Sequence, residues 1–242
     1  LKLTKGKTKI SITGNVLFQI KKLNQEAING ESNRTYYLEE GDQIDILATK
    51  QSAYGYMSIE GGFDIKPFCK SVSILSRAKI GPNGGEKIKI NDKINIKSSS
   101  SNKKNFLTKI SNINKNIIRV LEGPQFNYFS KDSQNNFFSK EYKISNLTDR
   151  MGMRLEGTVM KNIVNTNIRS EGITKGAIQV PADGQPIILL TDYPTIGGYP
   201  KIANVASADY NQLIQKTPGE KISFELIKLH EAEQLYKEHL NS

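Results

Sequence analysis

Polar side chains and glycines gather in one short stretch of the chain, residues 176–203. Its second half carries carboxylate, hydroxyl, phenol and ammonium groups around a glycine pair: Asp192, Thr195, Gly197, Gly198, Tyr199 and Lys201. Glycine has no side chain to keep a ligand away from the backbone, and polar loops on a rigid scaffold are frequent binding sites. The stretch therefore predicts a site for a small polar or anionic ligand.

Two short strands are expected to hold this loop. Ala177–Val180 and Ile187–Leu190 are apolar runs rich in β-branched residues, which favour strands. Turn-forming residues separate the two runs: Pro181, Asp183, Gly184 and Pro186. Aspartates in such turns often accept hydrogen bonds from local backbone amides. Asp183 and Asp192 therefore each have a turn-forming interpretation beside a ligand-binding one.

Arg150 and Arg154 form a second candidate site around Met151–Gly152–Met153. Two guanidinium groups this close in sequence can bind a carboxylate or phosphate through paired hydrogen bonds. Alternatively, one arginine packs its stem and pairs with Asp149 or Glu156 while the other faces solvent. Both interpretations stay open at this point.

The only two histidines, His230 and His239, both fall in a predicted C-terminal helix, more than two turns apart. A Ser-His-Asp triad would need one of them to fold back onto a strand. The single cysteine, Cys69, has no local partner for nucleophilic catalysis, and one cysteine with two distant imidazoles argues against zinc. We therefore expect neither triad chemistry nor a metal site.

The composition is that of a globular protein with one large or two small domains in 242 residues. The net charge of +10 comes from scattered lysines, which alternate with isoleucine in Lys87–Ile90 and Lys93–Lys97 as on the solvent face of a strand. A nucleic-acid partner is therefore not expected. There is no apolar run long enough for a bilayer and no leader-like start, and a single cysteine excludes an internal disulfide. We expect a cytoplasmic protein without a membrane partner.

The first 97 residues read as short strands separated by turn signals, which is typical of a barrel or sandwich. The predicted strands are Lys9–Thr13, Val16–Ile20, Gln43–Leu47, Ala53–Ile59, Lys87–Ile90 and Lys93–Ile96. A polar run rich in serine, asparagine and lysine follows, and it predicts a linker over residues 98–116.

Residues 117–242 form a second strand-rich unit. Strands are predicted near Ile117 and in the segments Glu141–Ser145, Ile202–Ala206 and Lys221–Lys228, besides those around residues 176–191. Ser207–Asp209 can cap a short helix that carries Leu213 and Ile214. Leu229, Ala232, Tyr236 and Leu240 recur at helical spacing and predict an amphipathic C-terminal helix. The predicted class is mainly β.

Five ordered segments carry a resemblance to a known family: Ala53–Asp64, Leu121–Gln125, Asp149–Gly157, Ser170–Ile173 and Gly176–Ala203. They resemble the biotin-dependent carboxyltransferase family. That family includes the C subunit of bacterial 5-oxoprolinase, the KipA-type kinase-inhibitor antagonist, proteins like the second subunit of allophanate hydrolase, and the carboxyltransferase region of urea carboxylase. Family members begin with Thr-Val-Gln-Asp-Leu-Gly-Arg-like and Ser-Gly-Ala-Met-Asp-like motifs, which do not occur here, and the chain opens on Leu1. We therefore expect an N-terminal truncation.

The resemblance implies two cyclophilin-like β-barrel subdomains and a short C-terminal helix, with the site in the cleft between the barrels. By resemblance, Arg150 and Arg154 clamp an anion, Gln179, Asp183 and Gln185 line a turn, and Asp192, Thr195, Tyr199 and Lys201 face the cleft. We expect Asp192 to orient or deprotonate a nucleophile. Lys201 and the two arginines would stabilise developing oxyanion charge, helped by backbone amides near Gly197 and Gly198.

The activity implied is that of one component of an ATP-dependent 5-oxoprolinase-type complex, which hydrolyses an amide of a small polar or anionic substrate. Its expected partners resemble the A and B subunits of 5-oxoprolinase, and ATP is bound either by this chain or by the complex. An alternative is carboxyl transfer from carboxybiotin to a urea-like acceptor. A third interpretation is a non-catalytic module that binds a partner protein of the complex.

Overall fold

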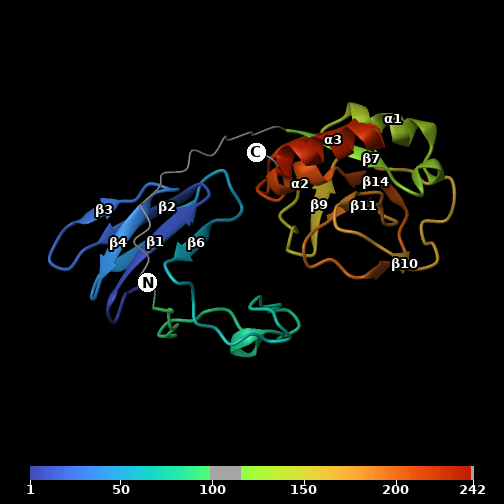
Figure 1. The fold of residues 1–242 in the computed structure, drawn as a ribbon. Coiled ribbons are helices and arrows are strands. Elements are labelled where there is room, and N and C mark those ends of the chain that lie inside the picture. The colour runs from blue at the N-terminus through green and yellow to red at the C-terminus, as the bar shows by residue number, and fades with distance from the viewer. Residues whose placement is uncertain (99–115, 241–242) are drawn as a thin grey trace. The chain divides into compact units, whose positions relative to one another are not determined.

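The computed structural model describes residues 1–98 and 116–240. The chain divides into two compact units, Leu1–Ser111 and Asn112–Ser242 (Figure 1). Apart from its two end residues, the predicted linker over residues 98–116 lies outside the described residues. The expected cleft between the subdomains stays a prediction.

The first unit contains two three-stranded antiparallel sheets, ordered β4-β1-β6 and β3-β2-β5. Their strands are β1 (Lys7–Thr13), β2 (Val16–Lys21), β3 (Ala27–Asn29), β4 (Thr35–Glu39), β5 (Gln43–Thr49) and β6 (Tyr56–Ile59). Alternate residues of β1 and β2 point into one core, because successive strand side chains face opposite sides. That core consists of Ile10, Ile12, Val16, Phe18, Ile20, Leu38 and Ile44.

Two predicted strands of the first unit are wrong. Lys87–Ile90 and Lys93–Ile96 form no strand in the described part of the chain, although Ile96 makes an isolated bridge to Phe63. The isoleucine of a half-buried strand should face a core, but Ile90 is 92% exposed. The lysine–isoleucine alternation therefore has the period of a strand. Among the described residues, however, it has neither a partner strand to pair with nor an apolar surface to pack on. A short 3-10 turn, η1 (Pro82–Gly85), precedes this segment.

The second unit is built on a closed barrel, and the predicted mainly β class is confirmed. Seven strands follow one another around it in the order β11-β12-β9-β8-β15-β7-β14, and β14 pairs with β11 to close the ring. Their bounds are β7 (Ile117–Glu122), β8 (Tyr142–Ile144), β9 (Gly152–Glu156), β11 (Ala177–Gln179), β12 (Ile187–Leu189), β14 (Lys201–Val205) and β15 (Lys221–Leu226). Ile118, Ile178, Ile188, Ile202 and Ile222 are fully buried in the core.

Three helices accompany the barrel in the described residues of this unit. The C-terminal helix is confirmed as α3 (Leu229–Leu240), and the short helix as α2 (Ser207–Leu213). The capping prediction for α2 is wrong, because Ala206 is the N-cap and no side chain caps the helix. The sequence reasoning missed α1 (Lys131–Ser139), which Ser130 caps by accepting a hydrogen bond from the Ser133 amide, and it also missed the 3-10 turn η2 (Phe126–Tyr128).

The stacking of Phe137 on Phe224, with ring centroids 4.4 Å apart, fixes α1 against β15. Within the described ranges, no helix is long and apolar enough to cross a membrane.

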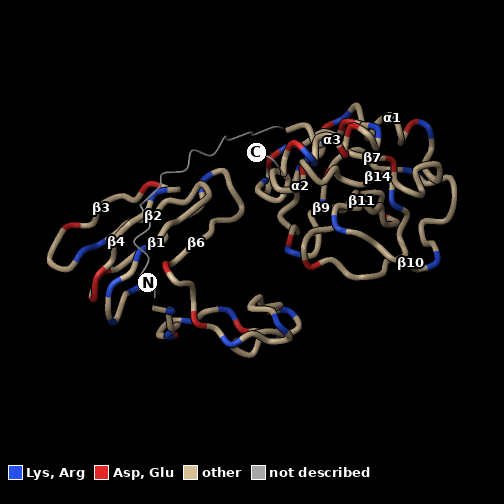
Figure 2. The backbone as a smooth tube through the Cα atoms, viewed as in Figure 1, with Lys and Arg blue, Asp and Glu red and all other residues tan. Residues whose placement is uncertain are grey.

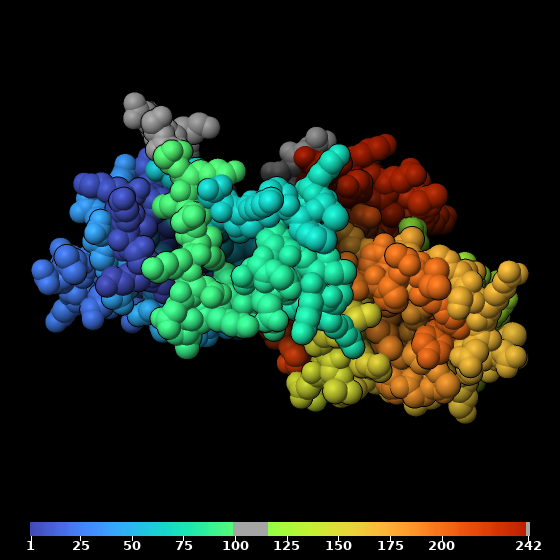
Figure 3. Space-filling model, turned by 90° about the horizontal axis from the view of Figure 1, so that it is seen from below, coloured from blue at the N-terminus to red at the C-terminus, as the bar shows by residue number. Residues whose placement is uncertain are grey.

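A two-stranded ribbon lies outside the barrel. It consists of β10 (Glu171–Gly172) and β13 (Ile196–Gly197), paired antiparallel (Figure 1). A small apolar cluster of Ile173, Ala177 and Leu189, with Tyr193 packed against it, joins the ribbon to the outer face of β11 and β12. In Figure 3 the yellow to orange segments that include this ribbon lie at the surface of the second unit. The ribbon therefore covers a part of the barrel wall that would otherwise face solvent.

Candidate functional site

The pairing of four barrel strands aligns three predicted site residues in one row. Lys201 on β14 lies opposite Gln179 on β11, Gln179 opposite Ile187 on β12, and Ile187 opposite Arg154 on β9. Directly opposed residues share a face of a sheet. Because the next residue along each strand belongs to the core (Ile202, Ile178, Ile188 and Met153), the row lies on the outer face of the barrel. With strands about 4.8 Å apart, it runs roughly 14 Å from Lys201 to Arg154.

A β-bulge and a close turn set the position of Lys201. The register between β11 and β14 shifts between Ile178 and Gln179, so that β14 advances by one extra residue before Lys201. Bulges commonly re-aim a side chain next to a functional site. The turn after β7 is bonded to the same strand, since Gln125 donates its amide to the Lys201 carbonyl at 3.2 Å. Gly123 permits this approach, because a Cβ there would lie 2.3 Å from the Lys201 carbonyl oxygen.

The ammonium group of Lys201 binds a carboxylate that the sequence reasoning had not included. Its side chain is only 5% exposed, and its Nζ donates a hydrogen bond to Oε1 of Glu171 on the ribbon. Gln125 Nε2 donates to the same oxygen at 2.8 Å. Hydrogen bonds from Lys201 and Gln125 hold the pKa of Glu171 below its usual value. Both missed residues lie in family-like segments, Ser170–Ile173 and Leu121–Gln125, and that was the signal that could have found them.

Gln179 has a buried donor without an acceptor. The side chain is 5% exposed, and its Nε2 has no hydrogen-bond partner. This nitrogen faces Gly197 on the ribbon, where a Cβ would lie 2.5 Å from it. Buried amide groups are nearly always hydrogen-bonded, so a buried donor without an acceptor is unusual and marks a place where an acceptor group could bind. Lys201 and Gln179 of the barrel wall therefore form one compact group with Glu171 and Gly197 of the ribbon.

Asp192 and Arg150 pair with each other away from this group. Arg150 donates from Nε and NH2 to the two carboxylate oxygens of Asp192, at 2.8 and 3.1 Å. Asp192 lies beyond the last residue of β12, whereas the row crosses β12 at its first residue, Ile187. The Asp192 carboxylate is therefore already occupied by a bidentate guanidinium contact. Arg154 projects from β9 with an exposed side chain and is not part of that contact.

The remaining predicted residues lie in the turn after β11 and on the ribbon. Asp183 accepts a hydrogen bond from the Gln185 amide at 3.0 Å, as in the turn-forming interpretation, and Gln185 bonds the backbone of Gly157. Thr195 and Tyr199 are exposed beside the ribbon. The carbonyls of Thr195 and Gly198 accept hydrogen bonds from Ile173 and Ile168, which extends the ribbon pairing at both ends.

The charges of the described chain do not form one basic surface. Figure 2 shows lysine and arginine interleaved with acidic residues over both units. Within the described ranges, no group of three or more histidine, cysteine, aspartate or glutamate side chains could hold a metal ion.

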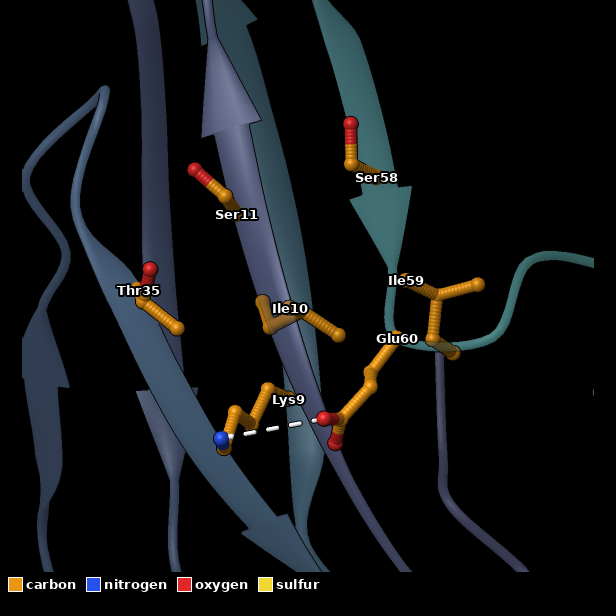
Figure 4. Close-up of a pocket in the computed structure, with 7 residues that line it drawn as sticks. All are labelled: Lys9, Ile10, Ser11, Thr35, Ser58, Ile59 and Glu60. Carbon is orange, nitrogen blue, oxygen red and sulfur yellow. Dashed lines mark ion pairs between the residues drawn. The ribbon is translucent and has the colours of Figure 1, made fainter. Parts of the chain in front are cut away.

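A hollow of about 220 Å³ lies on the outer face of the β4-β1-β6 sheet in the first unit (Figure 4). Ser11, Thr35 and Ser58 line it, and Lys9 and Glu60 point toward one another at its rim, 3.7 Å apart. It is an open depression that contains none of the predicted site residues.

Comparison with known proteins places the chain in a family. Residues 2–226 match the model described as the carboxyltransferase domain, subdomains A and B. The chain belongs to this carboxyltransferase-domain family. The match extends over both units of the structure.

Relatives of this carboxyltransferase domain include components of a bacterial enzyme. The chain is 32% identical over 195 residues to the C subunit of 5-oxoprolinase from Escherichia coli, covering 81% of this chain and 63% of the relative. It is 33% identical over 203 residues to the C subunit of the Haemophilus influenzae 5-oxoprolinase, covering 83% and 64%. The chain thus spans less than two thirds of these relatives.

The structure resembles the urea carboxylase of Kluyveromyces lactis, with a TM-score of 0.84 at 25% identity. The match covers 99% of this chain and 23% of the larger enzyme. In this carboxyltransferase domain, the Lys201–Gln179 pair beneath the ribbon is the part of the row that combines a positive charge with an unused hydrogen-bond donor.

Proposed function

We propose that this chain is the carboxyltransferase-like component of a 5-oxoprolinase-type enzyme, which opens the amide of a small anionic substrate together with partner subunits. The observation that carries this proposal is the orphan Nε2 of Gln179 beside the buried ammonium group of Lys201. The similarity to two 5-oxoprolinase C subunits supports the choice of substrate. The single cysteine agrees with a cytoplasmic location.

The chemistry proposed for the row is stabilisation of a carbonyl oxygen. As a nucleophile adds to an amide, its oxygen gains negative charge, and preorganised donors aimed at that oxygen lower the barrier. Lys201 and Gln179 lie side by side on one face and can supply an ammonium and an amide hydrogen to one such oxygen. Arg154, further along the row, can bind another anionic group of the substrate or partner. The Arg150–Asp192 pair would then stabilise the end of β12 without contacting the substrate.

ATP is assigned here to the partners that resemble the A and B subunits of 5-oxoprolinase. A triphosphate carries several negative charges and is usually bound by multiple cations and backbone amides. Lys201 supplies a single cation, and Gln179 adds one neutral donor. This donor set fits a carbonyl or carboxylate group better than a triphosphate.

The test is ATP-dependent 5-oxoproline cleavage by the complex reconstituted with its partner subunits. Replacing Lys201 with alanine should lower kcat at least about 100-fold, in line with the loss of one oxyanion donor. Lys221→Ala is the matched control, because Lys221 is an exposed lysine of the same barrel paired with Glu141 at 3.2 Å. If the Lys201→Ala complex turned over as fast as the wild type, Lys201 would have no role in the reaction.

If the folded chain binds its partner subunits but the resulting complex shows no turnover, the chain is a partner-binding module. In that case Lys201→Ala should leave the association unchanged.

A second candidate function is carboxyl transfer from carboxybiotin to a urea-like acceptor. It is favoured by the structural match of nearly the whole chain to urea carboxylase. The ureido oxygen of biotin is a neutral acceptor that Gln179 Nε2 and Lys201 could bind, and the bound cofactor would supply the carboxyl group. This candidate requires saturable biotin binding that Gln179→Ala weakens. Calorimetry without a binding signal would count against it.

A further inference from the structure

Glu171 reaches Lys201 from an element separate from the barrel. Its side chain is 43% exposed, whereas the lysine that it binds is almost completely buried. One of its oxygens, Oε1, accepts from both Lys201 Nζ and Gln125 Nε2. The ribbon therefore delivers a carboxylate oxygen onto a cationic position in the barrel wall.

The Glu171 carboxylate does not bind the neighbouring donor, Nε2 of Gln179. Gln179 lies opposite Lys201 on the adjacent strand, and its buried Nε2 has no acceptor. A free carboxylate has two oxygens about 2.2 Å apart and can accept from two neighbouring donors at once. A carboxylate ligand at Lys201 could therefore satisfy both Lys201 and Gln179, which Glu171 does not do.

The ribbon is short and is attached by few contacts. β10 and β13 contain two residues each, and the apolar cluster around Ile173 holds them to the barrel. Gly197 presses directly on the Gln179 amide, with no room there for a Cβ. In this closed position the ribbon excludes any ligand from Gln179, so access requires the ribbon to lift.

We propose that the β10–β13 ribbon is a lid over a carboxylate-binding site formed by Lys201 and Gln179, and that Glu171 occupies this site in place of the ligand when the lid is closed. The ligand class is a small carboxylate. The proposal deepens the proposed function and rests on it for the identity of that carboxylate. Binding exchanges the Lys201–Glu171 ion pair for a ligand carboxylate, which also pairs with Gln179.

The first test measures binding by calorimetry with the full chain. Glu171→Gln keeps the shape of the side chain but removes the competing charge, so 5-oxoproline and acetate should each bind about 5- to 10-fold more tightly than to the wild type. The neutral carboxamide of 5-oxoproline should gain no affinity. Glu141→Gln, which changes an exposed acid paired with Lys221, is the matched control and should leave all three affinities unchanged.

The second test follows the lid without any ligand. The amide of Ile173 donates to the Thr195 carbonyl at 3.2 Å, so its hydrogen exchange reports on the ribbon. Exchange should be faster in Glu171→Gln and in Gly197→Ala. It should be unchanged in Gly172→Ala, because a Cβ at Gly172 meets nothing within 4 Å. Exchange in the barrel core at Ile178 should stay slow in all variants, which would show that they are folded.

The proposal is overturned if Glu171→Gln binds the carboxylates no more tightly than the wild type, if the carboxamide gains as much affinity as the acid, or if Ile173 exchange does not change. Acetate binding and exchange do not depend on turnover. A complex that lacks 5-oxoproline cleavage but passes both tests would therefore refute the proposed function alone. A complex that cleaves 5-oxoproline but fails them would refute the lid alone.

Discussion

Lys201 and Glu171 show how a single contact links two parts of the second unit. A buried ammonium group is costly unless a charge and hydrogen bonds compensate it. Here the compensating carboxylate belongs to the ribbon, and its own position depends on Gln125 as well. Because Glu171 is partly exposed, solvent screens the pair, so its contribution to stability is modest and its partner is exchangeable.

The stability contributed by Glu171 should depend on pH. Its pKa is below the usual 4.5 because Lys201 and Gln125 donate hydrogen bonds to it. A lowered carboxyl pKa in the folded state gives stability that is complete above the unfolded value and is lost as the pH falls through the folded one. The difference in free energy of unfolding between the wild type and Glu171→Gln should therefore be constant above about pH 5 and should shrink below pH 4.5. Urea unfolding at a series of pH values measures this difference in free energy. A difference that grows on acidification would contradict the lowered pKa of Glu171.

At the scale of elements, the bulge in β14 and the turn at Gly123 together set the position of Lys201, the first residue of the row that ends at Arg154. The extra residue of β14 lets Ile202 and Ala203 both enter the core while Lys201 points outward. The turn is bonded to both sides of this bulge, since Gly123 donates to the Ile202 carbonyl and Gln125 to the Lys201 carbonyl. The ribbon then lies over the outward-facing residues.

Replacing Gly123 with alanine should both destabilise the barrel and move Lys201. A Cβ at 2.3 Å from a backbone carbonyl oxygen cannot be relieved by a side-chain rotation. We expect a loss of about 1–3 kcal/mol in the free energy of unfolding, as for overpacked sites, together with lower kcat. Gly172→Ala is the control, because the space around Gly172 is open. Unchanged stability of Gly123→Ala would show that the turn can move away from β14.

At the scale of the whole molecule, each unit has its own main hydrophobic core among the described residues. One is the set around Ile12 and Phe18 in the first unit, and the other is the larger set around Phe137 and Ile178 in the barrel. A unit with its own core can unfold as its own cooperative transition. The carboxyltransferase-domain match covers both units, so each belongs to the family description.

Core substitutions should therefore act on one transition at a time. Phe137 and Phe18 are both almost fully buried, and truncating either to alanine should cost about 3–5 kcal/mol. In calorimetry of the full chain, Phe137→Ala should lower the transition of the second unit and Phe18→Ala that of the first. Two transitions that always shift together would indicate one cooperative unit.

Local patterns in the sequence predicted much of the fold. The apolar runs around residues 177–180 and 187–190 became β11 and β12, and the spacing of Leu229 and Ala232 predicted α3. The same method failed at Lys87–Ile90, where the strand-like alternation has no neighbouring strand among the described residues to complete its hydrogen bonds. It also missed α1, because the polar residues Gln134 and Asn136 interrupt the apolar pattern by which a helix with a buried Phe137 could have been recognised.

The sequence by itself determined the mainly β class, the two strand-rich regions and the family resemblance. Only the tertiary structure decided which polar residues meet. Lys201, Gln179 and Arg154 come from three strands whose register depends on closure of the barrel and on the β14 bulge. Glu171 joins them because a ribbon folds over the barrel wall. Arg150 pairs with Asp192 and does not form an anion clamp with Arg154. Such contacts depend on long-range strand pairing, which residue types and spacing along the chain do not encode locally.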